Sequence, residues 1–235
     1  MPTATYADRR QQLETYFDRT AVEAWTRLTS DAPVSGIRAT VREGRERMRA
    51  TLLDWLPQDL HGRRILDAGC GTGALAQAAA RRGAQVVAVD LSPSLVSLAR
   101  ERIGRDQGAG RIEFQVGDMS DPALGRFDHV VGMDSLIHYR PADVVRVLAG
   151  LAARTDRSML FTFAPGSAFL RAFLALGRLV PRGDRSPAIV PVAEGTLRRR
   201  IAAEPALAGW RTARTQRVAR GFYTSQALEV LRGRC

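Results

Sequence analysis

Residues 67–73 of the sequence read DAGCGTG, and this glycine-rich stretch decides the fold. Its first two residues close a short apolar run, Ile65–Ala68, and a helical stretch from Ala74 to Arg82 follows. The next run, Gln85–Asp90, is β-branched and ends on an acid. Glycines let a backbone approach a ligand closely and adopt positive φ at no steric cost. The order strand, glycine turn, helix and acid-terminated strand predicts a βαβ unit whose turn binds a nucleoside-containing ligand.

Three details of this region favour S-adenosylmethionine (SAM) over a nicotinamide dinucleotide. The glycine spacing is not the G-x-G-x-x-G of dinucleotide sites. Asp67 directly precedes the turn, where a carboxylate can face an amino-acid ammonium group instead of repelling a pyrophosphate. Asp118 and Met119 follow the third predicted strand, where they can hold an adenine by its exocyclic amine and its face. Asp90 is then expected to accept hydrogen bonds from ribose hydroxyls.

The rest of the chain continues the alternation of strands and helices. Further strands are predicted at Arg111–Val116, Phe127–Met133 and Ser158–Phe163, with helices at Pro93–Ile103 and Pro141–Arg154. Such alternation indicates a parallel sheet covered on both faces. The tail, Trp210–Val218 and Gly221–Leu231, predicts two strands joined by a tight turn, which would add an antiparallel hairpin to the sheet edge. Residues 6–56 show helical spacing of apolar positions and are broken near Pro33 and Gly36.

The motif order resembles that of class I SAM-dependent methyltransferases. This resemblance implies a Rossmann-like α/β fold: a mostly parallel seven-stranded sheet, an antiparallel C-terminal hairpin and an N-terminal helical lid. We expect the lid at residues 1–57 and the methyltransferase domain at 58–235, with an inserted helical arm at about 165–193. SAM is the expected co-substrate, and no protein-bound metal is expected. The expected cofactor-binding residues are Asp67, Gly69, Cys70, Gly71, Asp90, Leu91, Asp118, Met119, Met133 and Arg42.

The segment after the fourth predicted strand, Gly132–Arg140, faces the methyl acceptor in that fold. It contains no Asn-Pro-Pro-Tyr or Asp-Pro-Pro-Tyr motif, which disfavours methylation of nucleic-acid bases. Of the three histidines, His61 and His129 flank predicted strands and are interpreted as surface or packing residues. His138 lies in the acceptor segment, and we expect it and Tyr139 to form the catalytic side of the site.

Several longer segments resemble the magnesium-protoporphyrin IX O-methyltransferases of chlorophyll and bacteriochlorophyll biosynthesis. They are Tyr16–Thr20, Glu23–Leu28, Val41–Arg45, Leu136–Tyr139, Phe161–Pro165 and Arg220–Ser225. The resemblance implies that SAM methylates one propionate of magnesium protoporphyrin IX, giving a monomethyl ester. It also implies the large subunit of magnesium chelatase as a partner that delivers the substrate. Plant and cyanobacterial relatives tend to carry Tyr where this chain has Thr29, so the role of that hydroxyl stays unassigned.

The chemistry of this reaction sets what His138 must do. A propionate should titrate near pH 4.3, so at neutral pH the nucleophile is ionised and no general base is strictly required. The protein must instead align the carboxylate with the methyl group and strip it of water without clamping it. A histidine can donate a single softer hydrogen bond where an arginine would form a fixed charged clamp. We therefore predict that His138 orients the propionate, with Tyr139 assisting or packing on the macrocycle.

The amino-acid composition indicates the class of protein and the cellular compartment. The 235 residues are 45% hydrophobic and 25% charged, which is typical of a globular protein. Cys70 and Cys235 offer no disulfide framework, which favours a reducing compartment. The polar N-terminus does not have the pattern of a secretory signal, and no apolar run is long enough to span a membrane. We expect a cytoplasmic protein that contacts at most the cytoplasmic face of the photosynthetic membrane.

The net charge of +11 is concentrated in the last third of the chain. All 35 basic residues are arginine, and residues 164–235 hold 13 of them against four acids. A GC-rich genome accounts for the missing lysines but not for the missing carboxylates. We interpret this region as a basic face for a membrane surface, an acidic protein or an anionic substrate. The apolar segment 166–180 could cap a tetrapyrrole pocket, rest on a membrane interface or be buried.

Two other functions compete with this interpretation. A SAM-dependent RNA or DNA methyltransferase would use the basic tail, but the base-methylation motif and aromatic-interleaved basic stretches are missing, so no nucleic-acid partner is expected. A methyltransferase of another small-molecule acceptor would share the cofactor loop. A module that only binds SAM is disfavoured because the acceptor-side histidine is present.

Overall fold

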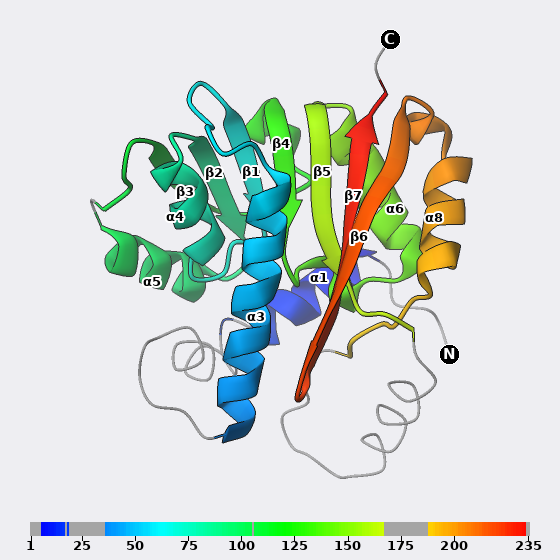
Figure 1. Cartoon of the computed structure of the whole chain (residues 1–235), viewed down its shortest axis with the longest axis horizontal. Helices are drawn as coiled ribbons and strands as arrows, with labels where there is room; N and C mark the ends of the chain where they lie inside the picture. Colours follow the sequence, from blue (N-terminus) through cyan, green and yellow to red (C-terminus); the bar gives the residue numbers. More distant parts are fainter. Residues whose placement is uncertain (1–5, 17, 19–35, 105, 167–187, 234–235) are drawn as a thin grey trace.

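The fold is built on one seven-stranded sheet with the order β3-β2-β1-β4-β5-β7-β6 (Figure 1). The computed structural model describes residues 6–16, 18, 36–104, 106–166 and 188–233. Five strands run parallel, and β7 is antiparallel to both of its neighbours. The strands are β1 (Arg64–Ala68), β2 (Gln85–Asp90), β3 (Arg111–Val116), β4 (Phe127–Gly132), β5 (Thr155–Phe163), β6 (Trp210–Arg220) and β7 (Tyr223–Arg232). The predicted mostly parallel sheet with an antiparallel C-terminal hairpin is confirmed.

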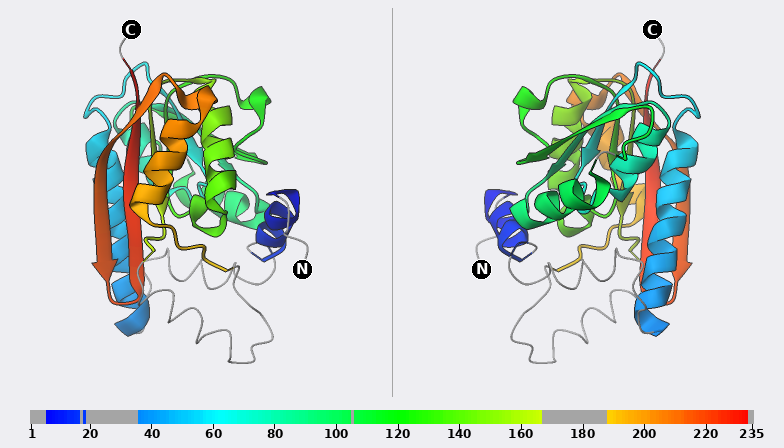
Figure 2. Two further views of the ribbon diagram at one scale, coloured as in Figure 1. Left: turned by 90° about the vertical axis from the view of Figure 1, so that its right-hand side faces the viewer. Right: turned by 90° about the vertical axis from the view of Figure 1, so that its left-hand side faces the viewer.

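Alternating side chains of the parallel strands feed two separate cores. Ile65 and Val86 pack with α3 (Gly36–Trp55), α4 (Ala74–Arg81) and α5 (Pro93–Ile103) on one face. Leu66 and Val87 pack with α6 (Pro141–Ala152) and α8 (Glu194–Ala203) on the other face. Figure 2 shows the two helical layers on opposite sides of the sheet. The near-continuous apolar runs of β1 and β2 follow from this burial on both faces.

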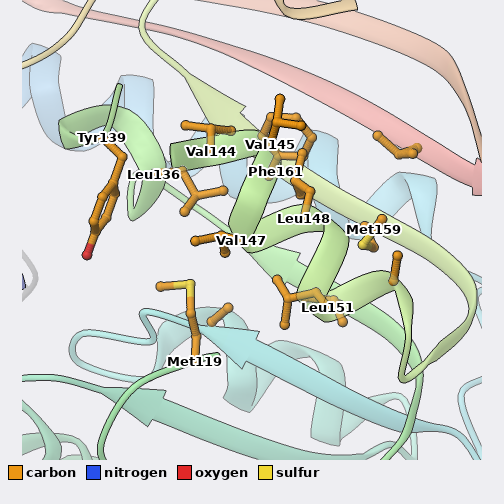
Figure 3. Close-up of a cluster of buried hydrophobic side chains, with 14 of the residues drawn as sticks. Met119, Leu136, Tyr139, Val144, Val145, Val147, Leu148, Leu151, Met159 and Phe161 are labelled. Atoms are coloured by element: carbon orange, nitrogen blue, oxygen red, sulfur yellow. The ribbon is translucent and has the colours of Figure 1, made fainter. Parts of the chain in front are cut away.

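The cluster on the α6 side reaches the carboxyl ends of the strands. Figure 3 shows the α6 residues Val144, Leu148 and Leu151 packed with Phe161 and Met159 of β5. Tyr139 lies at one end of this cluster, beside Leu136 of a short 3₁₀ helix, η3 (Leu136–His138). The hydrophobic core therefore supports the segment that joins β4 to α6.

The N-terminal helices lie on opposite sides of the strand ends (Figure 2). Helix α1 (Tyr6–Thr15) contributes Leu13 to the α6-side cluster. Helix α3 packs against β6, β7 and α4, and its Met48 and Leu52 are fully buried. Helix α3 approaches the hairpin closely because Gly44 has no side chain. A Cβ at that position would stand 2.5 Å from the Tyr223 ring. The division of the chain into two regions at residue 57 stays a prediction.

Apart from shifts of one or two residues at element ends, the structure differs from the sequence-based elements in three places. β5 begins at Thr155, three residues before the predicted start, and η3 was not anticipated. Helix α8 lies just after the predicted insertion, and only its Leu197 and Ile201 are buried. Two apolar positions among three consecutive arginines give a weak helical signal, so the pattern did not reveal it. Most of the predicted arm at about 165–193 lies outside the described residues.

Further short 3₁₀ turns at Pro122–Leu124 (η2) and Pro205–Leu207 (η4) complete the described elements. Within the described residues, every helix is too short or too polar to traverse a lipid bilayer.

Candidate active site

A pocket opens at the carboxyl ends of β1, β2 and β4, between α1 and α3. Ligands bind at this edge in open parallel sheets because the strand order reverses there. All twelve residues predicted for the site line this pocket: Arg42, Asp67, Gly69, Cys70, Gly71, Asp90, Leu91, Asp118, Met119, Met133, His138 and Tyr139. The roles assigned to them remain proposals, but the structure brings the whole set together.

The glycine turn between β1 and α4 is shaped by positive φ angles and close packing. Gly69, Gly71 and Gly73 have φ values of 86°, 52° and 78°. A Cβ on Gly69 would stand 2.5 Å from the Cβ of Ser135, so a side chain there would displace the acceptor segment. The backbone N–H groups of Gly69 and Cys70 donate to the carbonyl of Val89 at 2.8 and 3.0 Å. The turn is therefore anchored on β2 and wraps an open space.

Asp90 joins the glycine turn to the start of α5. Its carboxylate accepts hydrogen bonds from the backbone N–H of Gly71 at 2.8 Å and of Ser92 at 3.0 Å. Burial raises the pKa of Asp90, and these backbone donors act in the opposite direction. The N-cap of α5 is Ser92, whose hydroxyl accepts from Leu95, with Pro93 in the first turn as predicted.

Asp67 is a buried acid with an unsatisfied oxygen. Its side chain is 1% exposed, and its Oδ2 has no hydrogen-bond partner among the described residues. Burial, and then the nearby charge of Asp90, raise the pKa of Asp67 to about 7. An unpaired buried carboxylate is costly, and a cationic ligand would offset that cost. This orphaned oxygen fits the ammonium group expected of SAM. Gly71 lines the pocket, and a Cβ there would meet nothing within 4 Å, so the turn leaves room for a close ligand approach at that residue.

Asp118 is covered by α1. Its carboxylate accepts hydrogen bonds from the hydroxyl of Tyr6 at 3.2 Å and from the guanidinium of Arg10 at 3.1 Å. The Tyr6 ring also stacks on Tyr139, with centroids 5.3 Å apart. Burial raises the pKa values of both phenols, so both stay protonated at neutral pH. Sequence reasoning did not single out Tyr6, because its partners lie more than 100 residues away.

The acceptor side is formed by the segment that leaves β4. His138 in η3 is 6% exposed and lines the pocket. Asp134, two residues beyond the strand, also lines the pocket and has a φ of 56°. Its carboxylate forms an ion pair with Arg45 of α3 at 2.7 Å. Neither Asp134 nor Arg45 was predicted for the site.

Three arginines of α3 line the same wall of the pocket. Arg42, Arg45 and Arg49 follow helical spacing and so share one face. No carboxylate of the described residues forms an ion pair with Arg49, and its burial lowers the pKa of the guanidinium while Glu46 acts in the opposite direction. Sequence reasoning named Arg42 alone; the three-and-four spacing of these arginines is a signal that would have identified the other two, but it was not used.

The remaining sequence-based interpretations divide by location. His61 is exposed and contacts Asp59, and His129 is buried against the Ser158 hydroxyl, so their interpretation as surface and packing residues is confirmed. Burial lowers the pKa of His129 to about 4. Thr29 and residues 167–180 of the apolar segment lie outside the described residues.

Comparisons with known proteins agree with this geometry. The family model described as "Magnesium-protoporphyrin IX methyltransferase C-terminus" matches residues 132–232, and a general methyltransferase domain model matches residues 65–156. A magnesium-protoporphyrin O-methyltransferase of Rhodobacter capsulatus is 53% identical over 95% of this chain and 97% of its own length. Another, from Synechocystis, is 28% identical over 96% and 97%.

A solved structure is also similar over nearly the whole chain. The crystal structure of magnesium protoporphyrin IX methyltransferase from Synechocystis with bound S-adenosylhomocysteine (SAH) superimposes with a TM-score of 0.82 and 26% identity. The match covers 95% of this chain and all of the other.

Proposed function

The chain belongs to the magnesium-protoporphyrin O-methyltransferase family, and from this membership we propose that it methylates one propionate carboxylate of magnesium protoporphyrin IX with SAM as donor. The product is the monomethyl ester, an intermediate of chlorophyll and bacteriochlorophyll biosynthesis. The observation that carries the proposal is a single pocket that holds an unsatisfied buried acid, Asp67, and an acceptor-side histidine, His138.

The cofactor end of the pocket supplies a distinct partner for each part of SAM. Asp67 would face the ammonium group, and Asp90 would accept from the ribose while it keeps the glycine turn in place. Asp118, Met119 and Leu91 would hold the adenine. When bound, SAM supplies an electrophilic methyl group on a positively charged sulfur. The acids around it complement that charge, which favours the donor in this pocket.

At the acceptor end, His138 is proposed to hold the propionate in line with the methyl group. The propionate is already ionised at neutral pH, so catalysis depends on alignment and on exclusion of water. His138 is buried beside an apolar cluster, which would limit the access of water to the bound propionate. Tyr139 stacks on Tyr6, and we assign it a packing role in which it closes the pocket below α1.

Methylation of the propionate carboxylate is tested with labelled SAM and a panel of acceptors. Magnesium protoporphyrin, metal-free protoporphyrin, a simple fatty acid and RNA separate the proposed function from its competitors. We expect label in a base-labile ester of magnesium protoporphyrin and none in RNA. Transfer to RNA alone would overturn the proposal, and equal transfer to the fatty acid would indicate a different small-molecule acceptor.

The cellular context is also a proposal. The family resemblance suggests that the large subunit of magnesium chelatase delivers this poorly soluble substrate. Peripheral contact with an anionic membrane surface is suggested by the basic C-terminal third. In that region Arg198, Arg214, Arg220 and Arg232 form ion pairs within the chain. Arg211 and Arg217 are exposed on the edge strand β6, where they could face such a surface.

A further inference from the structure

We infer that Asp134 is a positioning residue, which holds Arg45 and the turn bearing His138 in the arrangement that methyl transfer needs. The inference rests on the proposed function, because it assigns His138 to the acceptor side. It concerns a buried carboxylate that lines the pocket and joins four separate elements of the fold.

The backbone of Asp134 adopts an uncommon conformation for a residue with a side chain. Its φ of 56° is the single positive value among the non-glycine residues that the structure describes. Left-handed backbone costs free energy outside glycine, and it persists where surrounding contacts impose it. Here the N–H of Asp134 donates to the Thr162 hydroxyl of β5 at 2.7 Å. This turn redirects the chain from β4 into η3, so it sets where His138 lies.

The carboxylate of Asp134 collects donors from three other elements. Arg45 of α3 donates at 2.7 Å, and the hydroxyls of Tyr223 and Ser225 of β7 donate at 3.1 and 3.0 Å. Thr162 of β5 completes the set at 3.1 Å. Hydrogen bonds to an ionised acceptor are shorter and stronger than neutral ones. One buried anion therefore fixes α3, β5 and β7 relative to the end of β4.

Arg45 and the turn that carries His138 both reach the acceptor side of the pocket. Arg45 lines the pocket on the α3 wall, and His138 lines it on the β4 wall. The carboxylate of Asp134 also offsets the positive charge of Arg45. An arginine without that neighbour would pair strongly with an incoming carboxylate and reduce its nucleophilicity. Asp134 thus sets both the position and the effective charge of the acceptor side.

The position of the turn is also coupled to the cofactor end. Ser135, the next residue, packs against Gly69 so closely that a Cβ on Gly69 would overlap it. A shift of the turn away from Gly69 leaves the glycine loop in place, because Gly69 and Cys70 are tied to Val89 of β2. Loss of the Asp134 carboxylate should therefore lower the rate of methyl transfer more than it weakens the binding of SAH.

Three substitutions separate the carboxylate from the backbone conformation. Asp134→Gly keeps the left-handed turn at low cost but removes the carboxylate. Asp134→Asn keeps the shape and removes the charge, and Asp134→Ala removes the carboxylate and keeps the strain. We expect all three to lower kcat by about 10- to 100-fold. The dissociation constant of SAH, measured by calorimetry, should stay within about threefold of the wild-type value. This change is smaller than the tenfold change that corresponds to about 1.4 kcal/mol of binding free energy.

A matched control lies on β4, the strand that leads into the turn. Asp128 of β4 also binds several donors, Arg63, Arg157 and the N–H of Arg64, but it does not line the pocket. Asp128→Asn should lower the melting temperature and leave kcat unchanged. If Asp134→Gly retains wild-type kcat, the carboxylate is dispensable and the inference is wrong. The inference is also wrong if Asp128→Asn lowers kcat as much as the Asp134 variants do for the same decrease in melting temperature, because the loss of kcat would then follow from lost stability alone.

A second readout does not depend on the identity of the acceptor. Amide hydrogen exchange of residues 135–139 should accelerate in Asp134→Asn and stay unchanged in Asp128→Asn, because the turn is held by the Asp134 carboxylate. Unaltered exchange in Asp134→Asn would contradict the inference. If the wild-type enzyme fails to methylate magnesium protoporphyrin, the proposed function fails, whereas this exchange measurement still tests the positioning role.

Discussion

The most consequential single residue at the cofactor end is Asp67, because its proton is linked to stability. Its pKa is raised from 3.8 to about 7 in the fold, so the folded state binds this proton more tightly than the unfolded chain. The contribution to stability is therefore favourable below about pH 4 and is lost as pH rises to about 7. Each pKa unit is about 1.4 kcal/mol, so the whole effect is of the order of 4 kcal/mol.

We therefore expect Asp67→Asn to raise the melting temperature of the ligand-free protein at pH 8 and to change it little at pH 4. An exposed acid, Asp106, provides the control, and Asp106→Asn should leave the pH dependence intact. Thermal unfolding followed by circular dichroism from pH 4 to pH 8 measures both. If the melting temperatures of wild type and Asp67→Asn change with pH in the same way across this range, ionisation of the buried acid does not destabilise the fold.

The same proton should govern ligand affinity. An ammonium group beside Asp67 favours its ionised form, so binding of SAH should release a proton and weaken as pH falls below about 7. Calorimetry in buffers of different ionisation enthalpy detects the released proton. Asp67→Asn should lose most of the affinity and all of the pH dependence. Wild-type affinity that stays constant between pH 6 and pH 8 would remove Asp67 from the ammonium site.

His138 is tested by its effect on turnover alone. His138→Ala should lower kcat by roughly a hundredfold through lost alignment while SAH affinity stays near wild type. His61→Ala is the matched control, since His61 is exposed and lies away from the pocket. Single-turnover transfer of labelled methyl to magnesium protoporphyrin is the measurement. Undiminished turnover in His138→Ala would exclude the histidine from the acceptor side.

Arg49 and Arg42 compete for one role, contact with the carboxylate of SAM. Arg49 is the stronger candidate, because it lines the pocket and no described carboxylate forms an ion pair with it. Arg49→Met should therefore weaken SAH binding by about tenfold or more, corresponding to one hydrogen bond between charged groups. Arg42→Met should weaken it less. The opposite order in calorimetry would restore Arg42, the residue that the sequence alone indicated.

At the scale of elements, the close fit of α3 on the C-terminal hairpin depends on Gly44. Gly44→Ala would place a Cβ 2.5 Å from the Tyr223 ring and should destabilise the protein by about 1–3 kcal/mol. Gly150 in α6 is the control, since a Cβ there meets nothing within 4 Å. Gly150→Ala should stabilise by about 0.5–1 kcal/mol through helix propensity. Chemical denaturation measures both, and equal shifts of the same sign would contradict this account of the packing.

The elements also show what the sequence can and cannot predict. β1, β2 and the turn between them were predicted because apolar runs, glycines and a terminal acid occur within 27 consecutive residues. Apart from Arg42 and Met133, the predicted cofactor residues come from such local signals at the ends of the first three strands. The contacts of Asp134 with Arg45 and Tyr223 were not predicted, because each of these two residues lies 89 positions away from Asp134 along the chain. Contacts of that range depend on how α3 and the hairpin pack, which no local pattern encodes.

At the scale of the whole molecule, the excess of arginine shapes the surface. β6 forms one edge of the sheet and exposes Arg211 and Arg217, whereas β3 forms the opposite edge. Charged residues on an edge strand also oppose pairing with another chain, so these arginines protect the sheet edge whether or not they contact a partner. A membrane role must therefore appear as binding that depends on this edge and not merely on net charge.

Flotation with vesicles distinguishes these possibilities. The protein should bind vesicles rich in anionic phospholipid at low salt and dissociate as salt screens the charges. Each arginine near the surface contributes about 1 kcal/mol, so Arg211→Gln with Arg217→Gln should weaken binding by roughly thirtyfold. Arg81→Gln with Arg111→Gln removes the same charge near the opposite edge and should have little effect. Equal losses in both double variants would reduce the effect to net charge, and no binding at low salt would exclude the membrane contact.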